Sequence, residues 1–213
     1  MKRIIDFNSG WYFQRQNNGP TLALAHGTAV NLPHTWNAED GQDGGNDYFR
    51  GVCWYVKKFS KPDLDGGEEA WLEFEGAAMT AEIYVNNKKL ARHEGGYSTF
   101  RVNITPALNE GENLLAVSVD NGKNRTVYPQ KADFTFYGGL YRPVRLLIVP
   151  AAHFRLDYYG GSGIRVTPKL SDDLKSAEVT VEAWVNGLAD HVKFTVGDKI
   201  SDAEVVDGYA QSV

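Results

Sequence analysis

Residues 133–144 read Asp-Phe-Thr-Phe-Tyr-Gly-Gly-Leu-Tyr-Arg-Pro-Val. This segment sets four aromatic side chains and a glycine pair between a carboxylate, Asp133, and a guanidinium, Arg142. The pair Gly138-Gly139 permits unusual backbone angles or a close approach to another segment. Aromatic faces stack on the C–H surfaces of sugars, and a carboxylate accepts hydrogen bonds from hydroxyl groups. Two interpretations follow, a sugar-contacting loop or a rigid loop with a structural Asp–Arg pair, and the residues alone favour the rigid loop.

Short stretches of alternating apolar and polar residues surround this segment. In residues 80–86, for example, Ala81, Ile83 and Val85 fall on one face of an extended chain, which is typical of a half-buried strand. Strands are predicted on the same grounds at residues 53–59, 71–75, 80–86, 113–119, 144–149, 164–167, 177–185 and 192–196. Residues 86–89 predict a hairpin turn. No long helix is expected, only a helical turn over 106–109 with Thr105 as its N-cap.

The strands fall into two groups on either side of Pro150. Residues 1–150 contain a complete-looking set, and a fresh alternating run begins at His153. We therefore predict an all-β chain with two domains, residues 1–150 and 151–213. An immunoglobulin-type sandwich needs about 100 residues, so we expect the second domain to continue beyond this sequence.

Composition excludes several classes of function. The net charge of -5 and the scattered lysines and arginines disfavour nucleic-acid binding. No apolar run is long enough to span a bilayer, and no apolar signal-peptide core follows Met1. The single cysteine, Cys53, lies in an apolar run and is expected to be a buried strand residue. One cysteine cannot form an intrachain disulfide, which fits a reducing compartment, so we expect a cytoplasmic protein.

Several motifs occur together in a fixed order. They are Leu-Pro-His-Thr-Trp at 32–36, Gly-Val-Cys-Trp-Tyr at 51–55, Glu-Phe-Glu-Gly at 73–76, Gly-Gly-Tyr-Ser-Thr-Phe at 95–100, and the alternating strand at 113–121. With residues 133–144, this set resembles the N-terminal sugar-binding domain of glycoside hydrolase family 2, which includes β-galactosidases, β-glucuronidases and β-mannosidases. The resemblance runs from about Phe7 to Val149. Beyond Pro150 the sequence resembles the start of the family's immunoglobulin-like second domain.

The resemblance implies a jelly-roll, galactose-binding-like β-sandwich followed by a partial immunoglobulin-like β-sandwich. It also implies a non-catalytic N-terminal fragment of a β-galactosidase-like hydrolase. Retaining glycosidases use two carboxylates about 5–5.5 Å apart, and in this family both lie on a (β/α)₈ barrel. No alternation of strands and helices typical of a barrel is present in the sequence. The chain is therefore expected to be inactive alone, with no catalytic residue, cofactor or metal of its own.

Three residues match positions that contact or border the sugar in the family. Asp133 matches the aspartate that reaches the sugar in the first subsite. Arg50 falls near the same sugar, although a structural role is an equal alternative, and Tyr128 falls at the pocket edge. Arg142 is expected to be structural. His34 is expected to be a turn residue that bonds to backbone, and Thr35, which replaces a common aspartate, is expected to bond locally to backbone.

Two other functions remain open at this stage. A stand-alone carbohydrate-binding module would present solvent-facing tryptophans in an open groove, and a purely structural pair of sandwiches would contact no sugar. The expected partners are a β-galactoside or related β-glycoside and the catalytic barrel of the parent chain, and relatives also form homo-oligomers. The motif Phe-Tyr-Gly-Gly-Leu-Tyr-Arg at residues 136–142 resembles β-galactosidases more than β-glucuronidases.

Overall fold

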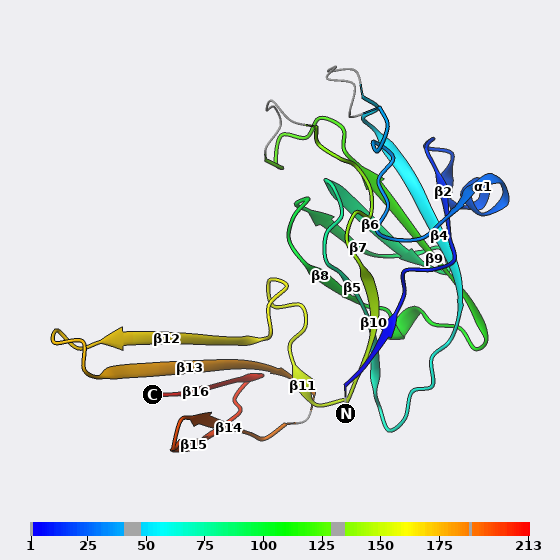
Figure 1. Cartoon of the computed structure of the whole chain (residues 1–213). Helices are drawn as coiled ribbons and strands as arrows, with labels where there is room; N and C mark the ends of the chain where they lie inside the picture. The colour runs from blue at the N-terminus through cyan, green and yellow to red at the C-terminus, as the bar shows by residue number, and fades with distance from the viewer. Residues whose placement is uncertain (1, 41–47, 129–134, 188) are drawn as a thin grey trace. The chain divides into compact units, whose positions relative to one another are not determined.

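The computed structural model describes residues 2–40, 48–128, 135–187 and 189–213 (Figure 1). Within them, nearly all regular structure is strand, which confirms the all-β prediction. The described residues form two compact units. The larger contains residues 2–64 and 69–148, and the smaller contains residues 65–68 and 149–213. The division of the chain into domains at 1–150 and 151–213 stays a prediction.

The larger unit is a sandwich of two sheets. Across the six-stranded sheet the order is β3 (Thr28–Val30), β2 (Trp11–Gln14), β4 (Val52–Ser60), β9 (Glu112–Asp120), β6 (Thr80–Val85) and β7 (Lys88–Glu94). Across the four-stranded sheet it is β1 (Arg3–Asp6), β10 (Val144–Val149), β5 (Glu69–Phe74) and β8 (Phe100–Asn103). Alternate residues of both sheets meet in one apolar core, as period-two strands require. Fully buried members of that core include Trp11, Tyr55, Leu72, Phe74 and Ile83.

The turn between β6 and β7 lies at Asn86 and Asn87, as the sequence predicted. Both residues have positive φ angles, 51° and 65°, and asparagine tolerates this left-handed region better than most side chains. Consecutive left-handed residues give a two-residue turn whose twist matches that of the flanking strands. The asparagine pair therefore fixes the register of this hairpin.

Two short helical segments differ from the sequence predictions. The helix α1 (Gly19–His26) begins with Pro20 in its first turn and was not foreseen. The 3₁₀ turn η1 (Thr105–Ala107) forms one residue earlier than expected, and Ile104, not Thr105, occupies the N-cap position. The Thr105 hydroxyl instead accepts a hydrogen bond from the backbone N–H of Ala70 at 2.8 Å. Because α1 has only eight residues, no α-helix in the described part of the chain is long enough to cross a membrane.

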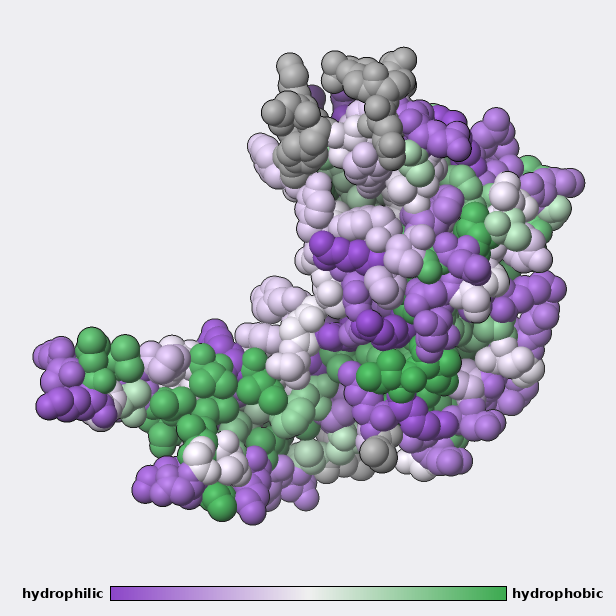
Figure 2. Space-filling view, in the orientation of Figure 1, coloured by the Kyte–Doolittle hydropathy of each residue, from purple (hydrophilic) through white to green (hydrophobic). Residues whose placement is uncertain are grey.

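The smaller unit is built around one long strand, β13 (Ala177–Asn186). This strand pairs with β11 (His153–Phe154), β12 (Ile164–Leu170) and β16 (Tyr209–Ser212), and β14 (His191–Val196) forms a hairpin with β15 (Lys199–Glu204). Its buried core contains Val181, Ala183, Val185, Val192, Phe194 and Ala210. Apolar side chains gather on the visible surface of this unit (Figure 2), and an open groove is lined by Val179, Phe194 and Ile200, among others. Its immunoglobulin-like character stays a prediction.

Candidate functional site

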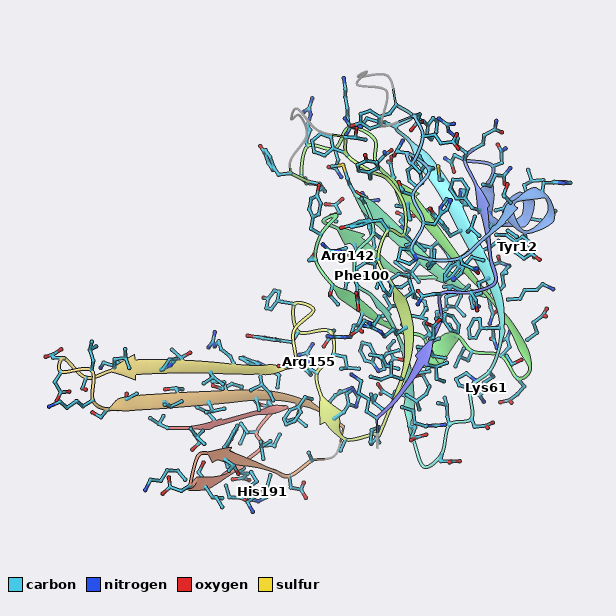
Figure 3. All side chains as sticks on the ribbon, viewed as in Figure 1. Tyr12, Lys61, Phe100, Arg142, Arg155 and His191 are labelled. Atoms are coloured by element: carbon cyan, nitrogen blue, oxygen red, sulfur yellow. The ribbon has the colours of Figure 1, made fainter. Side chains whose placement is uncertain are left out.

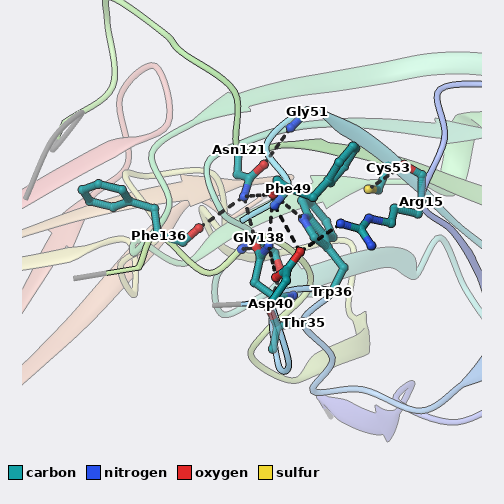
Figure 4. A network of polar contacts seen from close by, with 11 residues as sticks. Arg15, Thr35, Trp36, Asp40, Phe49, Gly51, Cys53, Asn121, Phe136 and Gly138 are labelled. Atoms are coloured by element: carbon teal, nitrogen blue, oxygen red, sulfur yellow. Dashed lines mark hydrogen bonds and ion pairs between the residues drawn. The ribbon is translucent and has the colours of Figure 1, made fainter. Parts of the chain in front are cut away.

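Four segments that are distant in sequence are joined by one polar network (Figure 4). They are residues 35–40, residues 49–51 before β4, Asn121 after β9, and residues 136–138 before β10. Strands β4 and β9 place two of these segments side by side, since Val52 pairs with Asp120. The network is therefore built on the neighbouring ends of two central strands.

Two buried asparagines occupy the centre of the network. Asn37 and Asn121 are both 0 % exposed, and the Asn121 side-chain amide donates to Asn37 Oδ1 at 3.2 Å. Asn37 Oδ1 also accepts the N–H of Gly138 at 2.8 Å. Asn121 accepts the N–H of Gly51 at 2.9 Å and donates to the carbonyl of Phe136 at 3.2 Å. Buried polar groups of this kind are stable only when paired, and here both amides are paired with backbone.

Asp40 extends the network toward the solvent. Its carboxylate accepts the side-chain amide of Asn37 at 3.0 Å, the N–H of Phe49 at 3.1 Å and the Arg15 guanidinium at 2.9 Å. The Arg15 guanidinium also lies 4.5 Å from the centroid of the Phe49 ring, within the range of a cation–π contact. Asp40 thus fixes the segment that leads into Arg50.

Gly138 and Gly139 lie where no side chain fits. A Cβ atom on Gly138 would lie 2.1 Å from Cζ2 of Trp36, and one on Gly139 would lie 2.5 Å from the carbonyl oxygen of His34. Gly139 also has a positive φ of 128°, which favours glycine. The Thr35 hydroxyl accepts the N–H of Asn37 at 3.2 Å, which confirms its expected local backbone bond. It also donates to the carbonyl of Gly138 at 2.7 Å. The glycine pair therefore serves a close approach of two segments.

His34 differs from its predicted role. Its ring Nδ1 lies 2.8 Å from the hydroxyl of Tyr55, so its ring partner is a side chain and not backbone as predicted. The reason is that the turn folds over the buried end of Tyr55. Burial lowers the pKa of the His34 imidazole and raises the pKa of the Tyr55 hydroxyl. Both groups are therefore neutral near neutral pH and serve packing.

Arg50 combines a structural bond with aromatic contacts. Its Nε–H donates to the backbone carbonyl of Asn121 at 2.8 Å. The guanidinium carbon lies 5.5 Å from the centroid of the Phe136 ring and 5.9 Å from that of Tyr48, both within cation–π range. Its Nη2 also donates to Sδ of Met79 at 3.9 Å. Because a guanidinium carries five N–H donors, these two bonds leave others for a ligand. Its sugar contact stays a prediction.

The other two predicted contact residues, Tyr128 and Asp133, make no described contact with this network. The Tyr128 side chain is 81 % exposed, which suits the edge of a binding surface. Asp133 lies outside the residues that the structure describes. The network therefore brings Arg50 and Phe136 together, and the roles of Tyr128 and Asp133 stay predictions.

Arg142 has the structural role that was expected of it (Figure 3). Its guanidinium donates to the carbonyl of Tyr97 at 2.9 Å and to that of Glu75 at 3.3 Å. It also lies 5.3 Å from the Tyr141 ring centroid, and the Tyr141 hydroxyl donates to the carbonyl of Gly96. Arg142 thus anchors the loop after β7 to the segment before β10.

Glu73 on β5 and Glu75 just after it alternate with Leu72 and Phe74, so the sequence predicts that both carboxylates face solvent or a partner sheet. Glu73 is instead only 8 % exposed, because arginines from two neighbouring strands cover it. It accepts hydrogen bonds from Arg101 at 2.6 Å and from Arg145 at 3.2 Å, and Arg145 also bonds to Glu75. Burial alone raises the pKa of Glu73, but the bonds and charges of the arginines hold it below its usual value. Glu73 is therefore a structural anion.

No tryptophan forms an exposed sugar platform. All five lie in the described part of the chain, and Trp11, Trp36, Trp54 and Trp71 are each at most 9 % exposed. The fifth, Trp184, is half-buried, and the Tyr158 ring is stacked on it with centroids 4.0 Å apart. This observation counts against the open-groove form of a stand-alone binding module.

Comparison with known proteins identifies the class. Residues 27–150 match the model of glycosyl hydrolases family 2, sugar binding domain, and the chain belongs to this family. It is 39 % identical over 151 residues to a β-glucuronidase of Bacteroides fragilis, covering 69 % of this chain and 21 % of that protein. It is 30 % identical over 187 residues to a β-galactosidase of Thermoanaerobacter pseudethanolicus, covering 85 % of this chain and 23 % of that protein.

The solved structures agree. The crystal structure of a Bacteroides uniformis β-glucuronidase matches with a TM-score of 0.82 and 27 % identity, covering 100 % of this chain and 28 % of that one. The chain thus spans less than a quarter of the length of the two curated relatives named above. Within family 2 it corresponds to the N-terminal sugar-binding region of a glycoside hydrolase.

Proposed function

We propose that this chain supplies sugar contacts and structural support to the catalytic domain of a parent β-glycoside hydrolase. The match of residues 27–150 to the family's sugar-binding domain carries this proposal. The polar network supports it, since buried hydrogen bonds give the loops the fixed geometry that a binding surface needs. The catalytic carboxylates would lie in the parent's barrel, and this chain alone would be inactive.

In this proposal Arg50, Tyr128 and Asp133 contact the sugar. Asp133 accepts hydrogen bonds from hydroxyl groups, and the free donors of the Arg50 guanidinium bond to hydroxyl oxygens. Tyr128 borders the site with its exposed ring. These groups hold the ring over the catalytic acids of the barrel, which lowers the entropy cost of reaching the transition state.

The substrate class is a β-glycoside, and we propose a β-galactoside first. Relatives are named both β-galactosidase and β-glucuronidase. The aromatic-rich motif around Gly138-Gly139 supports the choice of a β-galactoside as substrate. The parent is expected to hydrolyse p-nitrophenyl β-galactoside faster than p-nitrophenyl β-glucuronide, and the opposite preference would assign the glucuronide.

Asp133→Ala in the parent protein tests the function. A hydrogen bond to a charged group contributes about 1.5–3 kcal/mol, so kcat/KM is expected to fall roughly 10–100-fold. The matched control is Asp172→Ala, which removes an exposed carboxylate of the smaller unit. Unchanged kcat/KM in a folded Asp133→Ala protein would contradict the proposed sugar contact.

An NMR titration of the 213-residue chain with galactose and galactosyl disaccharides separates the two binding hypotheses. No binding by a chain with a well-dispersed spectrum is expected if the barrel completes the site. Millimolar or tighter binding that Asp133→Ala abolishes and Asp172→Ala preserves would favour the stand-alone binding module instead.

A further inference from the structure

We infer that Asn121 is a positioning residue that sets both Arg50 and the backbone of residues 136–138 for sugar contact. The inference rests on the proposed function, because it assigns a task to a residue that the sugar itself does not touch. Asn121 is completely buried, so any effect on the sugar passes through its neighbours.

Asn121 holds Arg50 at two points. Its backbone carbonyl accepts the Nε–H of Arg50 at 2.8 Å. Its side-chain Oδ1 accepts the N–H of Gly51, the next residue, at 2.9 Å. One bond orients the plane of the guanidinium, and the other fixes the peptide from which the side chain departs. The plane in which the remaining N–H donors of Arg50 lie is therefore set by Asn121.

The same side chain also holds the segment before β10. Its amide nitrogen donates to the carbonyl of Phe136 at 3.2 Å and to Asn37 Oδ1 at 3.2 Å. Asn37 Oδ1 in turn accepts the N–H of Gly138 at 2.8 Å. Two residues of the segment are thus anchored, one directly and one through Asn37. In the sequence, Asp133 stands three residues before Phe136.

Only a side-chain amide of this length meets these requirements. Asn121 must accept from one segment and donate to another through a planar group of fixed size, which an aspartate without a donor cannot do. The centroid of the Phe136 ring lies 5.5 Å from the guanidinium carbon of Arg50, so the two segments that Asn121 joins also contact each other through these side chains. A change at Asn121 is expected to alter both together.

Asn113 provides a matched control at the other end of β9. It is 1 % exposed, and its amide bonds to the carbonyls of Asn109 and Gly111, the N–H of Asn109 and the side chain of Asn86. None of these partners belongs to the network around Arg50. Asn121, directly after β9, follows Asn113 by eight positions, about 26 Å at the usual rise. Loss of Asn113 therefore removes a comparable buried amide without touching Arg50.

The test compares Asn121→Ala, Asn121→Ser and Asn113→Ala in the 213-residue chain. Asn121→Ser is the milder change and serves if the alanine variant does not fold. Amide exchange of Gly51 and Gly138, and the shift and solvent exchange of Arg50 Nε–H, are measured by ¹⁵N NMR. Urea is used to bring all proteins to the same global free energy of unfolding. Under these conditions the exchange rates of the three groups are expected to rise at least about tenfold over the unsubstituted chain in the Asn121 variants, and not in Asn113→Ala.

Equal protection of the three groups in Asn121→Ser and Asn113→Ala would overturn the inference. A second measurement links positioning to the sugar through a double-mutant cycle in the parent hydrolase. The double variant Asn121→Ser, Arg50→Lys is expected to show a smaller fold-loss of kcat/KM than the product of the fold-losses of the two single variants. Independent effects would also overturn it. If neither Asp133→Ala nor Arg50→Lys affects hydrolysis, the proposed function fails, whereas the exchange result still decides whether Asn121 positions Arg50.

Discussion

Replacement of Gly138 by alanine tests the close approach of the segment before β10 to Trp36. The added Cβ would lie 2.1 Å from Cζ2, 2.4 Å from Cε2 and 2.7 Å from Cη2 of Trp36. The indole cannot simply turn away, because it is stacked near Phe13 with centroids 6.0 Å apart and donates to the carbonyl of Phe49 at 3.3 Å. The backbone of the segment before β10 must therefore move.

The cost follows from three contributions. Overpacking of a filled site costs about 1–3 kcal/mol. Movement of Gly138 weakens its bonds to Asn37 at 2.8 Å and Thr35 at 2.7 Å, for about 0.5–1.5 kcal/mol each. Alanine also restricts the unfolded chain, which offsets about 0.4–1 kcal/mol. We expect a net loss of about 2–4 kcal/mol in the free energy of unfolding, a large share of the stability of a typical domain.

Urea unfolding followed by tryptophan fluorescence measures this loss, since four of the five tryptophans lie in the larger unit. The matched control is Gly96→Ala, whose Cβ would meet Ala78 at an ordinary 3.5 Å. A Gly138→Ala stability within about 1 kcal/mol of that of Gly96→Ala would refute the reasoning, because it would mean that the segment yields at little cost.

Two further predictions concern titratable groups. Hydrogen bonds from Lys89 and Tyr84 lower the pKa of Glu82 to about 2, so the carboxylate stabilises the fold fully above about pH 4.5 and this stabilisation is lost as the pH falls towards 2. Glu82→Gln is expected to flatten this part of a plot of unfolding midpoint against pH, and an unchanged slope would contradict the prediction. Burial raises the pKa of the Cys53 thiol to about 12. A thiol reagent at about pH 8 is therefore expected to label the unfolded chain and not the folded one. Rapid labelling of the folded chain would contradict this, because it would show that the thiol is accessible.

Local patterns predicted the frame of the larger unit well. The alternation of Ala81, Ile83 and Val85 is a property of neighbouring residues, and all three are buried in the core. The turn at Asn86-Asn87 is equally local. The helix α1 escaped prediction because Leu22, Ala23, Leu24 and Ala25 are consecutive and form no stripe with helical spacing.

The partners of polar residues could not be predicted in the same way. Alternation correctly separated Glu73 from its core-facing neighbours, but its arginines come from strands 28 and 72 residues away. His34 likewise bonds to a tyrosine 21 residues on. An asparagine in a loop is usually a turn residue, so nothing near Asn37 or Asn121 indicated that the two would meet in the interior.

The length of these connections couples the candidate site to the folding of the whole sandwich. The bonds Asn121–Asn37, Gly138–Asn37 and Thr35–Gly138 span 84, 101 and 103 residues. Contacts of such high sequence separation form only after the intervening strands have paired, because the loop-closure entropy must be overcome first. A destabilised sandwich would therefore lose the proposed sugar contacts even when no contact residue is changed. For this reason a weakened sugar interaction identifies a positioning residue only when an equally destabilising change at the far end of β9, such as Asn113→Ala, leaves that interaction intact.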